Sequence, residues 1–249
     1  MEILGIDIGG SGIKGAIVET KNGELITDRK RIPTPQPATP EAMLQTVKEL
    51  VDFFGWKGVI GCGFPAAVQH DIVRTASNID KSWIGLNAAK KIEKLTGCPT
   101  HVVNDVDAAG LAEMKIGAGK NEQGVTIMLA AGTGIGSAIF IKKQLVPNME
   151  LGFIHVNGMP GEHYAANSVR EKENLDWKTW AGRFNEYLHR LDLLFWPDLF
   201  ILGGGVSKKF DQYGQYFDVK TPVIPAKTKN HAGIIGAALA AKDEGLKVK

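Results

Sequence analysis

Short apolar runs separated by turn residues open the chain and predict β-structure. Residues 3–8 are mostly apolar, are interrupted late by Asp7, and are followed by Gly9 and Gly10, which is typical of a buried strand that enters a tight turn. Strand character resumes over residues 13–19, and Asn22-Gly23 behind it is a hairpin signal. The opening is therefore predicted to be strand, glycine turn, strand, turn and strand.

Apolar and polar positions then alternate between helical and strand spacing. A helix is predicted from Thr39-Pro40 to Gly55, because apolar residues recur there at helical spacing. Further helices are predicted at 87–96, 105–116, 177–195 and after Gly233, and strands at 58–63, 100–103, 125–131, 135–142 and 199–202. Residues 157–174 are polar and contain glycine, so they are interpreted as a long surface loop, with a buried irregular segment as the alternative. The pattern indicates an α/β protein.

Composition and charge restrict the class of protein. The 249 residues are 44% apolar and 22% charged, with a net charge of +2, which argues against disorder and gives no global reason to expect nucleic acid or a membrane surface as partner. Cys62 and Cys98 cannot form a disulfide framework or a zinc site alone, which fits a reducing compartment. No signal peptide and no membrane-length apolar run is recognised, so a cytoplasmic location is predicted.

An internal repeat relates the two halves of the chain. Residues 10–18 (GSGIKGAIV) align without gaps on residues 132–140 (GTGIGSAIF), with five identities in nine positions at an offset of 122. Two similar strand-turn-strand hairpins, one in each half, predict two related lobes that face each other across a central cleft, with both glycine turns pointing into it.

Glycine turns of this kind are suited to phosphate binding. Without Cβ atoms the backbone can approach an anion, and successive N–H groups with the Ser11 and Thr133 hydroxyls form a nest of donors. The alternative is that these are merely tight hairpins, which the duplication disfavours. The glycines at 10, 12 and 15 also match a dinucleotide fingerprint, but that motif requires a helix where strand is predicted here. No P-loop occurs in the sequence.

Two acidic positions are candidates for chemistry. Asn104-Asp105 follows a predicted strand, and the carboxyl ends of strands are where α/β sheets bind ligands. Asp105 could accept a proton from a substrate hydroxyl while Asn104 orients the substrate, although Asn-Asp at a helix start is also a common cap. Asp7, beside the first turn, is placed to hold a hydrated magnesium ion, with a buried structural role as the alternative.

A third glycine-rich segment lies near the end of the chain. Gly203-Gly204-Gly205 follows a predicted strand and could admit a polyphosphate tail, with Lys208 and Lys209 close by, although such lysines can equally be solvated. The histidines are scattered without metal-ligand spacing, so no zinc is expected.

Together these motifs resemble the sugar kinases of the ROK group, which have the actin-like ATPase fold. The resemblance lies in residues 7–12, Asn104-Asp105, residues 131–136 and residues 203–207, and it extends through essentially the whole chain. Three further segments, at 75–83, 145–152 and 197–200, are similar to the bacterial subgroup that uses polyphosphate to phosphorylate glucose. The absence of a cysteine-rich zinc motif agrees with that subgroup.

The resemblance implies an α/β, actin-like ATPase (ribonuclease H-like) duplicated fold, with lobes at 1–110 and 111–249 and a C-terminal helix near 233–245 that can pack back onto the first lobe. It implies phosphoryl transfer from inorganic polyphosphate, and as an alternative from ATP, to the 6-hydroxyl of glucose with Mg²⁺. By resemblance Asp105 is the catalytic base, and the sugar contacts are Asn78, Asn104, Asp105 and Glu150. The implied phosphate-binding residues are Gly9, Gly10, Ser11, Gly12, Lys14, Gly132, Thr133, Gly134, Gly204 and Gly205.

One position departs from the family pattern. The family commonly has Glu-Leu-Gly-His, whereas this chain has Glu150-Leu151-Gly152-Phe153, which replaces an imidazole that can hydrogen-bond sugar hydroxyls by a ring that cannot. His155 would lie on the same face as Phe153 if this stretch were a strand, and could then compensate.

Several alternatives remain at this point. The chain could be an ATP-dependent glucokinase or glucomannokinase, or a non-catalytic actin-like filament protein. A sugar-responsive repressor would need a DNA-binding domain ahead of the first turn, where only six residues precede Asp7. A homodimer is expected, with the aromatic helix 177–195 serving the core first and a dimer surface second. A track for polyphosphate has the candidates Lys14, Lys81, Lys142, Lys143, Lys208 and Lys209.

Overall fold

The computed structural model describes residues 1–77 and 79–246, which fall into two compact units. The first unit comprises residues 1–112 together with 230–246, and the second comprises residues 113–229. Asn78, one of the expected sugar contacts, lies outside the described residues. The first unit thus includes the C-terminal helix, which the expected division at residue 110 allowed to pack back onto the first lobe.

The first unit is built on a mixed sheet with the strand order β3-β2-β1-β5-β8, in which β4 also pairs with β2. Its strands are β1 (Glu2–Gly9), β2 (Gly12–Glu19), β3 (Glu24–Leu25), β4 (Lys30–Ile32), β5 (Ile60–Phe64) and β8 (Thr100–Asn104), with β6 (Val68–Gln69) and β7 (Ile72–Val73) as a separate hairpin. Its helices are α1 (Pro40–Phe53), η1 (Lys81–Trp83), α2 (Ala88–Thr96), the start of α3 (Asp105–Lys115), η5 from Asn230 on (Lys229–His231) and α8 (Ala232–Asp243).

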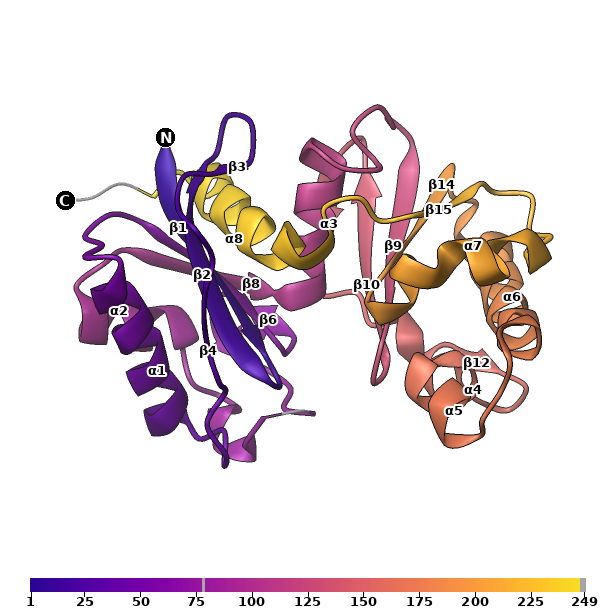
Figure 1. Ribbon diagram of the computed structural model, residues 1–249, viewed down its shortest axis with the longest axis horizontal. Coiled ribbons are helices and arrows are strands. Elements are labelled where there is room, and N and C mark those ends of the chain that lie inside the picture. Colours follow the sequence, from indigo (N-terminus) through magenta and orange to yellow (C-terminus); the bar gives the residue numbers. More distant parts are fainter. Residues whose placement is uncertain (78, 247–249) are drawn as a thin grey trace. The chain divides into compact units, whose positions relative to one another are not determined.

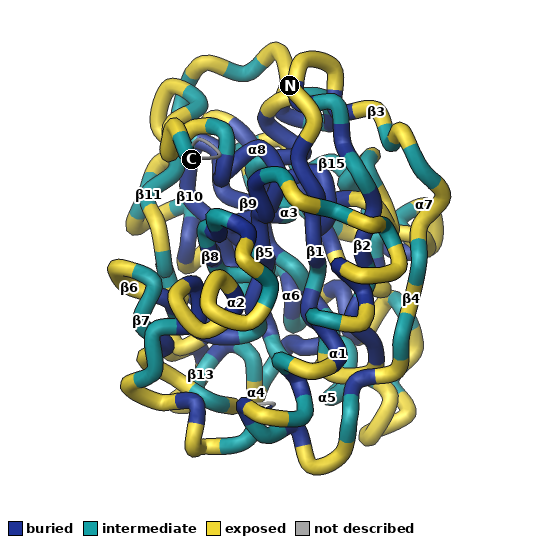
Figure 2. The backbone as a smooth tube through the Cα atoms, turned by 90° about the vertical axis from the view of Figure 1, so that its left-hand side faces the viewer, coloured by how far each residue is buried: buried dark blue, intermediate teal, exposed yellow. Residues whose placement is uncertain are grey.

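Helices cover both faces of this sheet (Figure 1). On one face, Leu4, Ile6 and Ile8 of β1 join the core beneath α1 and α2. On the other face, α8 packs directly on the backbone of Gly5 and Gly61, where a Cβ would lie 2.1 and 2.0 Å from carbonyl oxygens of the helix. Glycine is therefore required for α8 to approach, and this contact places the C-terminal helix in the first unit. All of β5 and most of β1 are buried (Figure 2).

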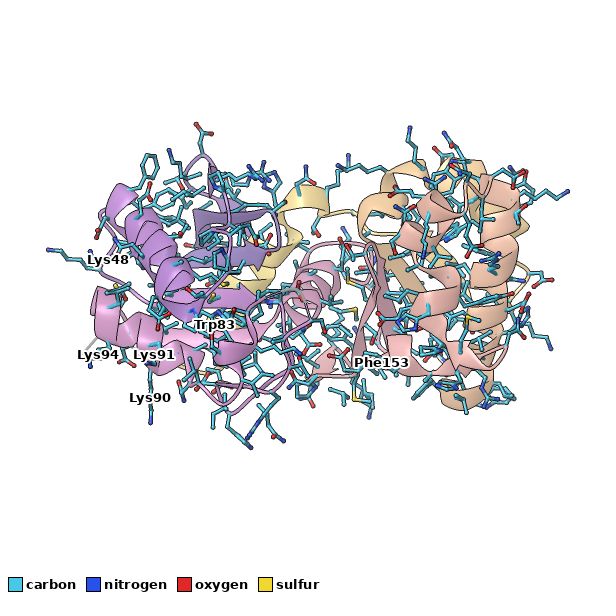
Figure 3. The ribbon with its side chains drawn as sticks, turned by 90° about the horizontal axis from the view of Figure 1, so that it is seen from below. Lys48, Trp83, Lys90, Lys91, Lys94 and Phe153 are labelled. Atoms are coloured by element: carbon cyan, nitrogen blue, oxygen red, sulfur yellow. The ribbon has the colours of Figure 1, made fainter. Side chains whose placement is uncertain are left out.

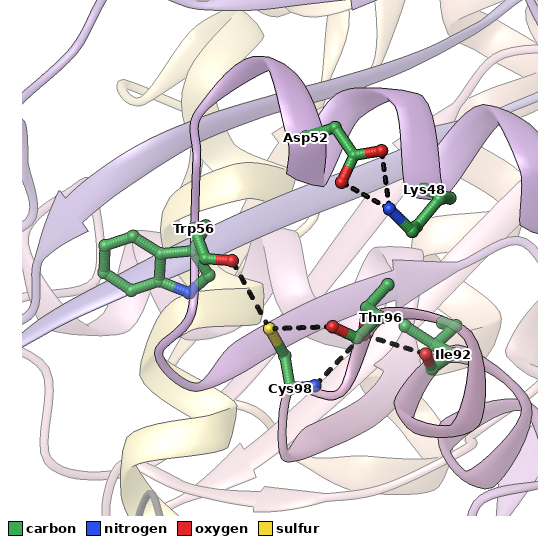
Figure 4. A network of polar contacts seen from close by, with 6 residues as sticks. All are labelled: Lys48, Asp52, Trp56, Ile92, Thr96 and Cys98. Carbon is green, nitrogen blue, oxygen red and sulfur yellow. Dashed lines mark hydrogen bonds and ion pairs between the residues drawn. The ribbon is translucent and has the colours of Figure 1, made fainter.

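Local signals in the sequence account for the ends of α1 and α2. The Thr39 hydroxyl accepts a hydrogen bond from the Ala42 N–H at 3.3 Å and Pro40 opens α1, while Gly97 ends α2 in the left-handed conformation. The Cys98 thiol lies between the two helix ends, 3.6 Å from the Trp56 carbonyl oxygen (Figure 4). Burial raises the pKa of this thiol, so Cys98 is a packing residue rather than a nucleophile.

The second unit is built on a sheet with the order β11-β10-β9-β14-β15. Its strands are β9 (Val125–Ala131), β10 (Ile135–Ile141), β11 (Gln144–Val146), β14 (Leu199–Gly203) and β15 (Val223–Pro225), with β12 (His155–Val156) and β13 (Met159–Pro160) as a separate hairpin. Its helices are η2 (Leu151–Phe153), α4 (Gly161–Ala165), α5 (Asn167–Lys172), α6 (Trp177–Phe195), η3 (Gly205–Lys209), α7 (Phe210–Tyr213) and η4 (Gly214–Tyr216), beside the end of α3.

Aromatic side chains of α6 form the core of the second unit. Trp180, Phe184 and Tyr187 are fully buried, and the Trp180 indole N–H donates to the Ala165 carbonyl oxygen at 2.9 Å. The expectation that this helix packs into a core is confirmed. Burial of three aromatic side chains makes α6 the main apolar support of the second sheet.

The long loop predicted over 157–174 is wrong, because α4 and α5 lie within it. Gly161 lies against the ring of Tyr187, where a Cβ would come within 2.7 Å, and the Tyr164 hydroxyl lies 3.2 Å from Glu186 on α6. Helices this short hold less than two turns, so they leave no apolar periodicity in the sequence. Contacts with α6, rather than local pattern, determine their position.

The two sheets have the same topology. In the first, β1 is antiparallel to β2 and parallel to β5, which is parallel to β8. In the second, β9 is antiparallel to β10 and parallel to β14, which is parallel to β15. The repeat in the sequence therefore reflects a duplicated sheet, with a glycine turn at the same place in each copy.

Candidate functional site

Charged side chains line up across the first sheet beside the β1–β2 turn. The strand register pairs Asp7 with Lys14 and Lys14 with Arg31, and directly paired residues of neighbouring strands share one face of a sheet. The Lys14 ammonium donates to the Asp7 carboxylate at 3.0 Å. On the other side of Asp7 the paired residue is Gly63, which leaves that place without a side chain.

Side chains occupy two carbonyl groups at the first turn, while its N–H groups are open. The Thr34 hydroxyl donates to the Gly9 carbonyl oxygen and the Arg31 guanidinium to that of Ser11, both at 2.6 Å. The N–H groups of Gly10 and Ser11 donate to no group in the part of the chain that the structure describes. Open N–H groups side by side are what an anion-binding nest requires.

Asn104 and Asp105 lie where β8 gives way to α3. The Asn104 side-chain oxygen accepts hydrogen bonds from the N–H groups of Val106 and Asp107 at 2.8 and 3.0 Å, and its amide donates to the Ala66 carbonyl oxygen at 3.0 Å. The helix-cap interpretation of Asn104 is thus confirmed. One amide hydrogen remains for a ligand, because a side-chain amide carries more than one donor.

The carboxyl group of Asp105 has a strongly shifted pKa. Burial, followed by repulsion from Asp7, raises the pKa of Asp105 to about 7, against the opposing effect of a hydrogen bond from the Val106 N–H. Gly63 lies beside it, since a Cβ there would be 3.6 Å from the Asp105 Cα atom. A carboxyl group with this pKa gains and loses a proton near neutral pH, as a general base must.

Asp7 is the carboxylate beside the first turn that could hold the water shell of a divalent cation. Among the described residues no group of three or more His, Cys, Asp or Glu could hold a metal ion. One Asp7 oxygen is bonded to Lys14. A single carboxylate is suited to Mg²⁺ that keeps its waters and takes its other ligands from phosphates.

The second turn repeats the arrangement of the first with different partners. Gly9 pairs with Gly12 across the first turn, whereas Ala131 pairs with Ile135 across the second, whose loop is longer by one residue. Ser168 occupies the carbonyl oxygens of this loop: its N–H donates to Gly132 at 3.0 Å and its hydroxyl to Thr133 at 2.5 Å. Within the described residues the N–H groups of Thr133 and Gly134 donate to no group.

The third glycine segment lies against the base of the second turn. Gly204 has a φ of 77°, and a Cβ there would come within 2.5 Å of the Ala131 carbonyl oxygen. Both the conformation and the close approach require glycine. The structure thus brings Gly204 and Gly205 next to the turn formed by residues 132–134.

Two carboxylates lie beside the second turn. Ser137 fixes the segment that carries Glu150, because its hydroxyl donates to the Met149 carbonyl oxygen and accepts from the Leu151 N–H at 2.9 Å. Glu162, at the start of α4, accepts from the Ile135 N–H at 3.3 Å. Partial burial, followed by repulsion from Glu162, raises the pKa of Glu150.

Sequence reasoning missed Glu162 and Arg31. Glu162 belongs to the segment interpreted as a loop, and only the Gly161-Glu162 start of a short helix could have drawn attention to it. Arg31 lies on β4, a strand of three residues that no pattern predicted. Both residues reach the turns through contacts between segments far apart in the sequence.

Phe153 is an exposed side chain on η2, with 53% of its surface accessible (Figure 3). The premise that Phe153 and His155 share one face of a strand is wrong, because residues 151–153 form a helical turn and His155 begins β12. Compensation by His155 therefore loses its geometric basis.

The lysines considered for a polyphosphate track have varied surroundings. Lys14 is paired with Asp7, and Lys143 donates to the Lys120 carbonyl oxygen at 2.5 Å. Lys81 lies on η1, Lys142 follows β10, and Lys208 and Lys209 lie on η3. Figure 3 shows that Lys90, Lys91 and Lys94 point away from α2, a cationic face that sequence reasoning did not single out.

Comparison with known proteins gives consistent matches. The model of the ROK family matches residues 3–163. The polyphosphate glucokinase of Mycobacterium tuberculosis (strain CDC 1551 / Oshkosh) is 49% identical over 238 residues, which cover 95% of this chain and 90% of that protein. The polyphosphate glucokinase of Mycobacterium leprae (strain TN) is 46% identical over 95% of this chain and 74% of its own length.

Among solved structures, the inorganic polyphosphate/ATP-glucomannokinase from Arthrobacter sp. strain KM superposes with a TM-score of 0.92 at 41% identity, covering 98% of this chain and 99% of that one. No helix in the described part of the chain has the length and apolar character needed to cross a membrane.

Proposed function

The chain belongs to the ROK family and has its duplicated actin-like ATPase fold, and on this basis we propose that it is a sugar kinase. The reaction is transfer of a phosphoryl group from inorganic polyphosphate to the 6-hydroxyl of glucose, which gives glucose 6-phosphate. ATP is the second donor. The relatives named for polyphosphate and for polyphosphate/ATP support both donors.

The observation that carries the proposal is the environment of Asp105. Its carboxyl group has a pKa raised to about 7 and lies at the end of a parallel strand, near Asp7. In the proposed mechanism the Asp105 carboxylate accepts the proton of the 6-hydroxyl as that oxygen forms its bond to phosphorus. The remaining amide hydrogen of Asn104 orients the sugar.

Further sugar contacts come from the second turn's carboxylates. We assign Glu150 and Glu162 to the sugar because carboxylates accept hydrogen bonds from hydroxyls. Asn78 is included by family resemblance alone. Phe153 offers the sugar no polar group, since its side chain is apolar.

The glycine segments are assigned to the phosphoryl donor. The open N–H groups of Gly10 and Ser11 in the first turn and of Thr133 and Gly134 in the second can donate to phosphate oxygens. Gly9 and Gly12 complete the first turn with Lys14, and Gly132 completes the second beside Gly204 and Gly205.

Magnesium is the proposed cofactor, with Asp7 as the residue that holds its water shell. When bound, Mg²⁺ would neutralise negative charge on the phosphates of the donor. Lys14 keeps the Asp7 carboxylate in place through the 3.0 Å contact. A cytoplasmic homodimer remains part of the proposal, and the two buried free thiols agree with a reducing compartment.

The test is an assay of glucose 6-phosphate formation with polyphosphate and with ATP, on glucose and mannose, over a range of salt concentrations. Turnover with polyphosphate is expected, and its KM should rise more steeply with salt than that of ATP, because more charge contacts are screened together. Much faster turnover with ATP at low salt would replace the polyphosphate assignment by an ATP-dependent one. Absence of product with both donors would refute the kinase.

A further inference from the structure

Arg31 brings a guanidinium group onto the first glycine turn. It lies on β4 opposite Lys14, and its Nη2 atom donates to the Ser11 carbonyl oxygen at 2.6 Å. The side chain is otherwise exposed. Arginine therefore closes one side of the turn whose N–H groups are open.

The balance of charges beside the first turn indicates a role for the Arg31 guanidinium. Lys14 is paired with Asp7, so these two side chains together contribute no net charge beside the turn. Among the described residues no carboxylate lies within ion-pair distance of Arg31. Arg31 is thus the uncompensated cation of the turn, and an anion bound there would meet its charge first.

The absence of a side chain at Gly12 leaves the space that the Arg31 guanidinium occupies. A Cβ at Gly12 would lie 2.5 Å from Nε and 2.8 Å from Cζ of Arg31, and these are its nearest atoms. The φ angle of Gly12 is outside the left-handed region, so the backbone itself would accept alanine there. Because the guanidinium is the end of a flexible side chain, a methyl group at position 12 would displace the guanidinium rather than the backbone.

We propose that Arg31 binds a phosphate group of the phosphoryl donor at the first turn, together with the N–H groups of Gly10 and Ser11. The proposal rests on the kinase function given above and adds a donor-binding residue to it. A guanidinium presents a planar fork of N–H groups that matches phosphate oxygens. Its bond to Ser11 holds the fork in place before the ligand arrives, which lowers the entropy lost on binding.

The first experiment replaces Arg31 and follows the kinetic constants of both substrates. Arg31→Ala should raise the KM for polyphosphate and for ATP by about tenfold or more, since hydrogen bonds to charged groups contribute about 1.5–3 kcal/mol. The KM for glucose should stay within about twofold. Arg31→Lys should give donor KM values between those of the wild type and of Arg31→Ala, because lysine keeps the charge without the planar fork. Arg29→Ala, which removes an exposed arginine two positions earlier, is the matched control with unchanged constants.

If Arg31 only held the Ser11 backbone in place, the Arg31 variants would behave differently. The melting temperature of Arg31→Ala would then fall while the donor KM stayed as in the Arg29→Ala control, and that outcome overturns the proposal. An equal rise of the donor and glucose KM values would do the same, because it would indicate general damage to the first unit.

A second variant tests the role of Gly12 independently. Gly12→Ala puts a methyl group where the guanidinium lies, so it should raise the donor KM as Arg31→Ala does. In the Arg31→Ala background the same alanine should add less than about threefold, because residues in contact are not additive. Full additivity of the two changes would contradict the proposal.

A binding measurement separates this inference from the kinase function. Calorimetric titration with inorganic tripolyphosphate, without glucose, should give a dissociation constant about tenfold weaker for Arg31→Ala than for Arg29→Ala. If no variant phosphorylates glucose but this difference is found, the kinase proposal fails while the Arg31 site stands. If the wild type forms glucose 6-phosphate and the two variants bind tripolyphosphate equally, the Arg31 site fails alone.

Discussion

The two glycine turns have nearly the same sequence and the same place in their sheets, yet their surroundings differ in charge. In the first, Asp7, Lys14 and Arg31 lie side by side across three strands. At the offset of 122 the positions of Asp7 and Lys14 are taken by Leu129, which is fully buried, and Gly136. The second turn instead has the carboxylates of Glu150 and Glu162 nearby.

This difference indicates how a duplicated fold can be divided between two tasks. Both turns have side chains on their carbonyl oxygens, Thr34 and Arg31 in one and Ser168 in the other, so both expose N–H groups. The backbone thus offers open N–H groups twice. In the proposed function, the side chains around each copy decide what else is bound, with cations and the proposed proton acceptor Asp105 at the first turn and carboxylates at the second.

Asp105→Asn should have the largest effect on this comparison, because it removes the proposed proton acceptor from the first unit. We expect kcat to fall by about a thousandfold, within the usual range for loss of a general base, while glucose still binds. Asp28→Asn, an exposed change in the same unit, should leave kcat unchanged. A loss smaller than tenfold would exclude the base role for Asp105 and leave the first unit with donor binding alone.

The same variant should change the pH dependence of stability. The pKa of Asp105 is raised to about 7 in the folded protein, so its contribution to stability is present below its unfolded pKa and is lost as the pH rises through about 7. Asp105→Asn should therefore raise the melting temperature more at pH 8 than at pH 4. Equal shifts at both values would indicate that the carboxyl group is not strained when ionised.

The pH profile of the wild type should show the next largest effect. Below pH 7, kcat/KM should fall about tenfold per pH unit, because Asp105 must be ionised to accept a proton. Asp7 is the second cause of the raised pKa, so Asp7→Asn at saturating Mg²⁺ should move this limb to lower pH. If the acidic limb came instead from titration of the donor's own phosphates, Asp7→Asn would not move it. An unmoved limb would therefore assign this pH dependence to the substrate.

The sequence predicted the features of the fold that depend on local pattern. The strands around both glycine turns, the beginnings of the helices near Thr39 and Asn87, and the buried face of α6 follow from apolar spacing and turn residues. Asn104 and Asp105 could be singled out because they follow a buried strand directly. These signals lie within a few residues of the features that they predict.

What escaped prediction depends on contacts between distant segments. Arg31 reaches Ser11 across β2, and Glu162 reaches Ile135 from a helix of five residues. The helices between 157 and 174 are stabilised by packing on α6, and propensity in so short a segment is a weak guide. Strand pairing positions Arg31, and packing on α6 positions Glu162. Neither kind of contact leaves a pattern in the neighbouring sequence.

Glu162→Gln should have a moderate effect that separates the two turns. Removing its charge also removes the repulsion that raises the pKa of Glu150, so that pKa should fall toward its ordinary value. We expect the glucose KM to rise about tenfold, as for the loss of a charged hydrogen-bond partner, with the donor KM unchanged. Asp211→Asn, an exposed change on α7 in the same unit, is the control. A rise in donor KM instead would assign the second turn's carboxylates to the phosphate side.

Phe153→His should give the smallest effect and tests whether the second unit lacks a sugar contact. The phenyl ring of Phe153 is 53% exposed, so histidine should fit there with little change in melting temperature. An imidazole can donate to or accept from a hydroxyl, and one neutral hydrogen bond of about 1 kcal/mol corresponds to a glucose KM lower by about fivefold. Phe153→Leu is the matched control, since it keeps the position apolar and should leave the constant as it is. An unchanged KM in Phe153→His would show that position 153 does not meet the sugar, and the carboxylates of Glu150 and Glu162 would then account for sugar binding in the second unit without it.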